Sequence, residues 1–213
     1  AGLKPGWIEH PKSSPGSSRW IVEGGKYRTR ETGDNESING CEHLKNYEVL
    51  VNIQKSTNHA EGDYFGLIFR SPPDLNDATF GYYMVRVVCF SCEGTNSSSH
   101  RYRLELVDKQ GPYDSVLTSV DLEPSEFSFL AGEDYTLKAI VTDDVLIGKF
   151  WKSSELEPSD DPADTPKPAD PPEPARNGRT IETSNSSYSQ GKIGLASNTS
   201  KNTFDNLVVK PLS

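Results

Sequence analysis

The sequence predicts an all-β protein in which two antiparallel sheets pack face to face as a β-sandwich. Three apolar runs, YFGLIFR, GYYMVRVVCF and HRYRLELV, alternate with period two, which is typical of strands that bury one face. No stretch carries a convincing amphipathic helical pattern. Turn-rich polar segments divide the rest of the chain into short strands, about 11 to 13 in all.

The first fifth of the chain predicts an edge segment and a hairpin. Residues 1–18 are rich in Pro, Gly and Ser, and we interpret them as a tether or edge segment before a single domain of residues 19–213. RWIVEGGKYRTR predicts two short strands around a Gly-Gly turn. Residues 31–40 are expected to form a loop. The alternation from residue 45 to residue 54 then predicts a strand with four inward side chains, Tyr47, Val49, Val51 and Ile53.

In the three central runs, parity gives each strand one apolar face and one face that carries an arginine. Arg70, Arg86 and Arg103 then point away from the core, and antiparallel pairing of adjacent strands would gather them on one surface. Seven apolar side chains are predicted to lie between the sheets: Leu67, Phe69, Val85, Leu104, Leu106, Leu137 and Val209.

The last part of the chain predicts further strands and one interruption. Residues 115–122 indicate a strand, the segment 127–151 indicates a hairpin that turns at Asp143-Asp144, and GKIGLAS and TFDNLVVKPL indicate two final strands. Residues 155–176 carry Pro every few positions with acids between. Proline removes the amide donors that a sheet needs, so we interpret this segment as a long disordered loop inserted in the one sandwich.

Composition restricts the partners and the location. A net charge of −9 argues against nucleic acid, because binding to phosphates uses clustered Lys and Arg. No run approaches the roughly 20 apolar residues of a membrane helix. The chain shows no secretory signal and a single Met, so it is interpreted as a mature or excised domain. We expect a secreted or cell-surface protein.

In this order, the strands resemble the concanavalin A-like lectin/glucanase superfamily, a two-sheet jelly roll. The pieces that carry the resemblance are RWIVEGGKYR, GDYFGLIFR, GYYMVRV, YTLKAIV with its hairpin, and GKIGLAS followed by FDNLVVKPL. They are similar to laminin-G-like domains, to carbohydrate-binding modules of the levan-binding type and to the domain related to 3-keto-disaccharide hydrolases. The fold hosts lectins, binding modules, hydrolases and lyases, so it does not choose among them.

The polar sheet face predicts non-catalytic binding of a glycan or polysaccharide. Arginine offers planar paired donors to hydroxyls or carboxylates, and tyrosine offers a flat ring to the C–H face of a sugar. The plainer alternative is a solvated face on which the acids pair with the arginines. The candidate ligand-binding residues are Glu48, Asn52, Arg70, Tyr82, Arg86, Arg103 and Glu105.

Two other functions stay open. One is a laminin-G-like interaction or adhesion domain that uses its loops to bind proteins, including other domains of a larger protein. The other is a glycoside hydrolase or lyase. Retaining enzymes of this kind need two carboxyls about 5 Å apart, often on one strand. No such run occurs here, because Glu105 and Asp108 fall on opposite faces of their strand.

The resemblance also implies a structural calcium ion. In many jelly-roll binding modules an Asp of the terminal strand and an acid near the first strand hold this ion, and the matching positions are Asp205 and Glu23. Hard oxygen ligands suit calcium. The alternative is that Asp205 caps a turn or accepts a backbone hydrogen bond.

Three cysteines, Cys41, Cys89 and Cys92, leave at least one thiol free or intermolecular. We expect a disulfide between Cys41 and one of the other two. The alternatives are reduced thiols and a zinc site that combines the three cysteines with His43.

Overall fold

The computed structural model describes residues 6–10, 19–55, 57, 59–75, 80–92, 100–122, 124, 129–160, 178–199 and 201–212. These residues form strands and no helix, and in this part of the chain no helix is long and apolar enough to cross a membrane. The strands are β1 (Ile8–His10), β2 (Trp20–Glu23), β3 (Lys26–Thr29), β4 (Asn35–Asn39), β5 (Tyr47–Lys55), β6 (Tyr64–Ser71), β7 (Gly81–Ser91), β8 (Arg101–Gln110), β9 (Tyr113–Leu122), β10 (Asp134–Thr142), β11 (Val145–Lys152), β12 (Arg179–Ser184), β13 (Lys192–Ser197) and β14 (Asn202–Pro211).

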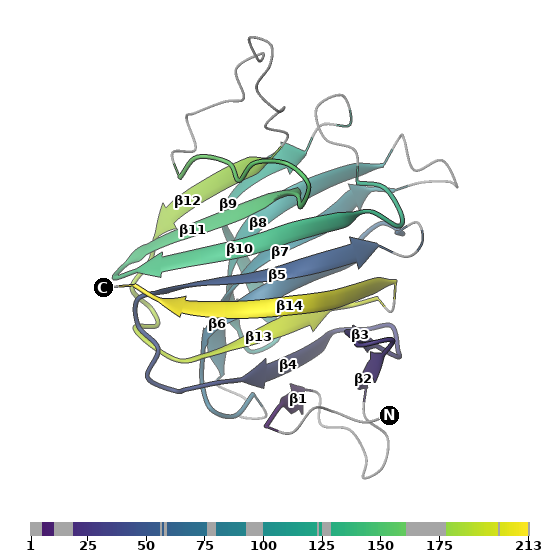
Figure 1. The fold of residues 1–213 in the computed structure, drawn as a ribbon. Coiled ribbons are helices and arrows are strands. Elements are labelled where there is room, and N and C mark those ends of the chain that lie inside the picture. The colour runs from purple at the N-terminus through teal and green to yellow at the C-terminus, as the bar shows by residue number, and fades with distance from the viewer. Residues whose placement is uncertain are drawn as a thin grey trace.

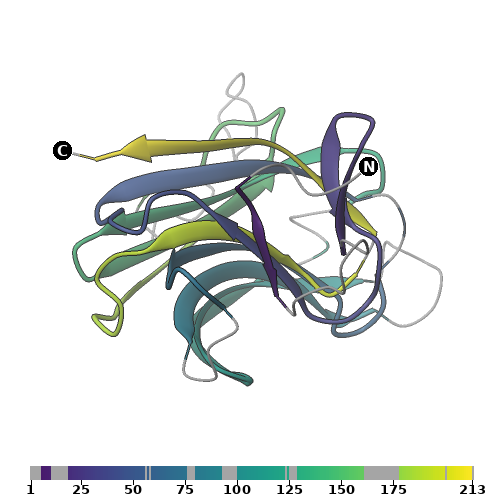
Figure 2. The same cartoon turned by 90° about the horizontal axis from the view of Figure 1, so that it is seen from below.

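Two antiparallel seven-stranded sheets pack as the two layers of a sandwich (Figures 1 and 2). Sheet A has the order β1-β4-β13-β6-β7-β8-β9, and sheet B has the order β12-β11-β10-β5-β14-β3-β2. The two C-terminal strands lie inside the sheets, β13 between β4 and β6 and β14 between β5 and β3. The predicted all-β sandwich is therefore confirmed.

The main core lies between the inward faces of the two sheets. The four inward side chains predicted for β5 are fully buried, as the alternation requires. Of the seven apolar side chains predicted for the core, Val209 is half-buried and packs against its edge. The other six are fully buried: Leu67, Phe69, Val85, Leu104, Leu106 and Leu137.

A second apolar cluster covers part of the outward face of sheet A. Ile68 and Met84 belong to it, and Leu75 and Phe80 pack over them from the connection between β6 and β7. All eight residues of β6 are buried as a result. The expectation of one buried face holds for β5 but is wrong for β6, because segments outside the strands supply the second layer of apolar contacts.

The turns follow their predicted chemistry. Gly24 and Gly25 join β2 to β3 with φ of 57° and 82°, the left-handed conformation that a two-residue hairpin loop needs and that glycine adopts without strain. Asp143 turns the β10–β11 hairpin with φ of 50°. Aspartate is one of the few other residues that tolerates this conformation.

Residues 31–40, expected to form a loop, contain strand β4. The only large apolar side chain in β4 is Ile38, so periodicity gave no signal there. The strand nevertheless buries Asn35, Glu36 and Ser37, because it pairs with β13 on one side and with β1 on the other. Strand β1 itself lies at the edge of sheet A, within the segment predicted as a tether or edge.

The Pro-rich segment begins as an ordered part of the sandwich. Glu157 accepts hydrogen bonds from Lys138 at 3.0 Å and from Lys149 at 2.8 Å, and the carbonyl of Pro158 accepts a second bond from Lys149. Asp160 also forms an ion pair with Lys149. The prediction of disorder is therefore wrong for residues 155–160, and residues 161–177 lie outside the described residues.

Candidate functional site

Four of the predicted ligand-binding residues share one surface, the outward face of sheet A. Tyr82 and Arg86 project from β7, and Arg103 and Glu105 project from β8, with Arg86 directly opposite Glu105 in the strand register. The residues that alternate with them face the core and are buried: Tyr83, Val85, Val87, Leu104 and Leu106.

Arg70 does not lie on this face, because a β-bulge interrupts the alternation of β6. Residues 68–71 of β6 oppose only residues 192–194 of β13, so β6 carries one extra residue there. Arg70 takes a left-handed conformation with φ of 53° and is 2% exposed. Its guanidinium donates hydrogen bonds to three backbone carbonyls, those of Lys45, Asp143 and Tyr188. Arg70 therefore ties loops together at the end of the sandwich.

Glu48 and Asn52 belong to the other sheet. Both lie on β5, in the middle of sheet B, and point away from the core. Glu48 pairs with Lys138 at 2.8 Å and Lys210 at 3.1 Å, and the hydrogen bond from Lys138 lowers the pKa of Glu48. Asn52 accepts a hydrogen bond from Thr136. The prediction of a single ligand-binding surface is wrong for these two residues.

Arg86 is held by two carboxylates on the outward face of sheet A. Its Nε lies 2.8 Å from Glu105, its Nη1 lies 2.6 Å from Asp114 on β9, and its guanidinium carbon lies 5.3 Å from the ring centroid of Tyr64. Burial raises the pKa of Asp114, but Lys109 and Arg86 outweigh it and hold that pKa below its usual value. For Arg86 the plainer alternative therefore holds, because acids of β8 and β9 pair with it on this face.

A buried carboxylate anchors the opposite end of the same face. Glu36 of β4 accepts a short hydrogen bond from the hydroxyl of Tyr82, lies 2.7 Å from Nδ1 of His10, and has Lys109 Nζ at 3.9 Å. The ring of Phe80 stacks on Tyr82. Tyr82 is consequently 0% exposed and is a structural anchor rather than an open platform for a sugar ring.

One accessible part of this face is a cluster that we call the arginine platform: Phe90, Arg101, Arg103 and Asp121. The guanidinium carbons of Arg101 and Arg103 lie 5.2 and 4.4 Å from the ring centroid of Phe90. Arg103 Nε donates to Asp121 at 2.6 Å. The side chains of Arg101, Arg103 and Asp121 stay 45%, 34% and 36% exposed. The platform therefore offers an aromatic ring and partly satisfied charged groups to solvent.

A separate polar hollow of about 280 Å³, including its open side, lies on the outward face of sheet B. Asp205 and Asn206 line it at a second bulge, between Asp205 and Val208, where β14 shifts register against β5. Asp205 Oδ1 accepts the backbone N–H of Asn206 at 2.8 Å. The other lining residues are Lys26, Asn52, Gln54, Asp134 and Thr203.

The residues predicted to hold calcium do not form a shared site. Glu23 lies 2.6 Å from Arg28 and is committed to that ion pair. Asp205 makes the backbone contact that was its alternative role, and the ammonium of Lys26 lines the same hollow. In the described part of the chain, the acidic groups near Asp205 do not form a set of three close ligands. Glu23 and Asp205 as a pair therefore do not fit calcium.

The cysteines pair differently from the prediction. Cys89 and Cys92 form the disulfide, with Cα atoms 5.9 Å apart, and Cys41 is free and exposed. A spacing of three would put Cys89 and Cys92 on opposite sides of a regular strand. Phe90 is the extra residue of a bulge between β7 and β8, and it returns Cys92 to the inner side. The predicted disulfide to Cys41 and the zinc site with His43 are both wrong.

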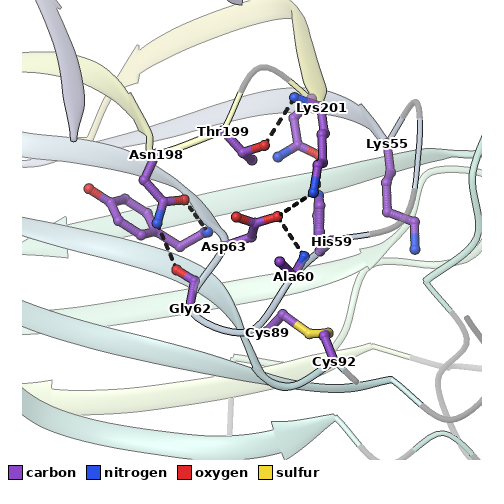
Figure 3. A network of polar contacts seen from close by, with 12 residues as sticks. Lys55, His59, Ala60, Gly62, Asp63, Cys89, Cys92, Asn198, Thr199 and Lys201 are labelled. Carbon is purple, nitrogen blue, oxygen red and sulfur yellow. Dashed lines mark hydrogen bonds and ion pairs between the residues drawn. A yellow bond between two sulfur atoms is a disulfide. The ribbon is translucent and has the colours of Figure 1, made fainter. Parts of the chain in front are cut away.

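A polar network closes the sandwich next to this disulfide (Figure 3). Asp63 accepts the backbone N–H of Ala60 at 2.7 Å and forms an ion pair with Lys201 at 3.0 Å. Asn198 accepts the N–H of Tyr64 and donates to the carbonyl of Gly62. These bonds fix the turn before β6 to the turn between β13 and β14.

Sequence reasoning missed several residues that build these surfaces. Asp114 and Asp121 lie on β9, and Glu36 lies on β4, the strand expected to be a loop. A signal was available for β9, because Asp114 and Asp121 follow the third arginine-bearing run in a strand that must pair with it. For Glu36 and Phe90 no periodic signal existed.

No family model matches the chain, and no curated protein matches it in sequence. Solved structures do match. The carbohydrate-binding module CBM66 from Bacillus subtilis is 16% identical, with 96% of this chain and 95% of the module covered and a TM-score of 0.60. The lumenal domain of VIP36, bound to Ca²⁺ and Man3GlcNAc, is 12% identical, with 98% and 85% covered and a TM-score of 0.61.

The legume lectin-like domain from Entamoeba histolytica is 9% identical, with 98% of this chain and 91% of that domain covered and a TM-score of 0.55. At these identities the likeness concerns the fold. It spans almost the whole chain in each case, as does the resemblance found in the sequence. The chain has the concanavalin A-like jelly-roll fold of lectins and carbohydrate-binding modules.

Proposed function

We propose that this protein is a non-catalytic glycan-binding module that works outside the cytoplasm, and that the arginine platform is its binding surface. The observation that carries the proposal is the stacking of Arg101 and Arg103 on the half-buried Phe90, with Asp121 close to both arginines and the three charged side chains 34–45% exposed. An aromatic ring suits the C–H face of a sugar, while guanidinium and carboxylate groups suit its hydroxyls.

The fixed geometry of the platform supports binding without catalysis. Asp121 holds Arg103 in one orientation, so less conformational entropy is lost when a ligand binds. A glycosidase acid needs a raised pKa at neutral pH. The carboxyls whose pKa departs from the usual value in the described residues, Glu48, Asp114 and Glu133, are all lowered.

The structural neighbours add support of a general kind. CBM66 is a carbohydrate-binding module, and the VIP36 domain was solved with a mannose-containing glycan. Of the seven predicted ligand-binding residues only Arg103 belongs to the proposed surface. Six are left out because each is on the other sheet, buried, or held in the ion pairs around Arg86: Glu48, Asn52, Arg70, Tyr82, Arg86 and Glu105.

The test is a glycan array with the purified protein, followed by calorimetry on the best ligand. Arg103→Ala should weaken binding by about 5- to 150-fold, which corresponds to about 1–3 kcal/mol for a lost charge-assisted hydrogen bond. The melting temperature should barely change, since partly exposed ion pairs contribute little to stability.

Arg28→Ala is the matched control, because Arg28 on β3 makes a comparable ion pair with Glu23 on β2, in the other sheet. It should bind like the parent. If Arg103→Ala and Phe90→Ala both bind a confirmed glycan at parental affinity, the platform is not the site. Release of reducing ends from the bound glycan would instead identify an enzyme.

A further inference from the structure

Cys89, Cys92 and His100 gather three donor atoms at the end of the sandwich where β7 leads to β8. One sulfur or nitrogen from each residue lies within 4.8 Å of the others, and all three residues are buried. They form the one group of three or more close His, Cys, Asp or Glu ligands within the described residues. Cys89 and Cys92 are joined as a disulfide, seen beside the polar network in Figure 3.

The backbone around these residues is fixed independently of the disulfide. The carbonyl of Cys89 accepts the N–H of Gly62, and the N–H of Cys89 donates to the carbonyl of Asp63, both at 2.8 Å. The bulge at Phe90 then directs Cys92 inward. His100 directly precedes β8, and its ring packs against Tyr102. The three donors would therefore stay together after the sulfur–sulfur bond opens.

We propose that Cys89, Cys92 and His100 are a redox-gated binding site for a soft divalent cation, Zn²⁺. In the oxidised protein the disulfide closes the site. A dithiol reductant supplies two electrons and two protons, the disulfide opens to two thiols, and the reductant becomes a disulfide. Zn²⁺ then displaces the two thiol protons and binds two thiolates and one imidazole nitrogen, with water as the fourth ligand.

The charge balance of this site suits its burial. Two thiolates neutralise Zn²⁺, so the reduced and loaded site carries no net charge, as the disulfide carries none. An uncompensated ion at a site that is 0–5% exposed would be strongly unfavourable. The donor set also selects the metal, because sulfur and imidazole ligands favour zinc, while calcium requires oxygen.

The experiment uses the full chain with Cys41→Ser, which removes the exposed thiol. The protein is reduced with dithiothreitol, freed of reductant without oxygen, and titrated with Co²⁺ as a spectroscopic probe. Zn²⁺ is titrated against a coloured chelator. The reduced protein should bind one ion per chain and show a thiolate-to-cobalt charge-transfer band. The oxidised protein should bind at least 100-fold more weakly.

His100→Gln tests the third ligand, with His43→Gln as the control on an exposed histidine. His100→Gln should weaken Zn²⁺ binding at least 10-fold with both thiols still titratable, and His43→Gln should not. Near-ultraviolet circular dichroism follows the fold in each state. The proposal is wrong if the reduced protein binds no ion, if it unfolds on reduction, or if His100→Gln binds Zn²⁺ like its parent.

Discussion

Lys55 is a buried cation without a carboxylate partner in the described residues. Its ammonium donates to the hydroxyl of Tyr102 at 3.2 Å and lies 4.9 Å from the ring centroid of Phe129. Burial lowers the pKa of Lys55 to about 8. His59, nearby in Figure 3, hydrogen-bonds Asn202 at 2.8 Å, and burial lowers its pKa to about 4. Burial thus disfavours the charged form of both side chains, so at pH 7 His59 is neutral while Lys55 keeps its charge at a cost in stability.

The loss of the Lys55 proton should therefore make stability rise with pH. Between pH 8 and the ordinary lysine pKa of 10.5, the unfolded chain binds a proton that the folded chain has released, so the unfolding free energy increases. Lys55→Met should stabilise the protein at pH 7 by about 1–3 kcal/mol. Its advantage over the parent should shrink as pH rises from about 8 towards 10.5, the ordinary lysine pKa.

Urea unfolding at a series of pH values measures this difference. Lys210→Met is the control, because Lys210 is exposed and pairs with Glu48 at the surface. It should show no comparable change with pH. A Lys55→Met protein that is less stable than the parent at pH 7 would mean that the bond to Tyr102 outweighs the cost of burial.

Among the elements, regular strands were predictable and bulges were not. Alternation located β5 to β8 and the core positions on them, because a half-buried strand leaves that pattern in the sequence. The bulges at Arg70 and Phe90 change the face of every residue beyond them, and no local sequence signal marks either one. For this reason parity placed Arg86 and Arg103 correctly, but failed for Arg70 and for the pairing of Cys92.

The sequence pattern also did not predict which of the two sheets each strand joins. Period-two alternation shows that Glu48 and Arg86 point away from the core, but it does not show that they lie on opposite sheets. Similarly, the Pro content of residues 155–176 was visible, whereas the ion pairs of Glu157 depend on Lys138 and Lys149 being adjacent on β10 and β11. Long-range pairing decided both cases.

The two parts of the Pro-rich segment should respond differently to deletion. Replacing residues 161–177 with a short Gly-Ser bridge should leave the melting temperature within a few degrees. Removing residues 155–160 as well takes the partners from Lys149, whose side chain is 2% exposed. This should cost about 2 kcal/mol, or about 4–8 °C for a domain of this size. Thermal melts compare three proteins: the shorter deletion, the longer deletion, and the longer deletion that also carries Lys149→Met.

In that comparison, Lys149→Met should recover part of the lost stability, because it removes the unpaired buried charge. Equal melting temperatures for the two deletions would show that residues 155–160 add nothing to stability.

Calcium binding through Asp205, which the sequence resemblance implied, has a direct test at the β14 bulge. An ion bound there would raise the melting temperature, chelation would lower it, and Asp205→Ala would abolish both effects. Because Asp205 already bonds Asn206 and Lys26 lines the hollow, we expect chelation to leave the melting curve unchanged. Asp205→Ala should then cost about 1 kcal/mol with or without calcium. A chelator effect that Glu23→Ala also removes would contradict this expectation and restore the predicted pair.

At the scale of the whole molecule, the fold is shared with proteins that are 9–16% identical. Most positions of a β-sandwich require only that apolar and polar residues alternate along the strands and that turns can form between them. Many different sequences have this pattern. The charged pairs on the outward face of sheet A are subject to no such rule. The alternation of apolar and polar residues therefore determines the fold, whereas the charged pairs are particular to this chain.

The placement of the last two strands has a consequence for how the chain folds during synthesis. β13 separates β4 from β6, and β14 separates β3 from β5, so residues 192–211 complete the interior of both sheets. Until they leave the ribosome, β5 and β6 each present an unpaired apolar edge, the kind of edge that recruits other chains. Closing β14 on β5 joins Asn202 to Lys55 across most of the sequence, which predicts slow folding. A nascent chain stalled before residue 192 would be a substrate for chaperones.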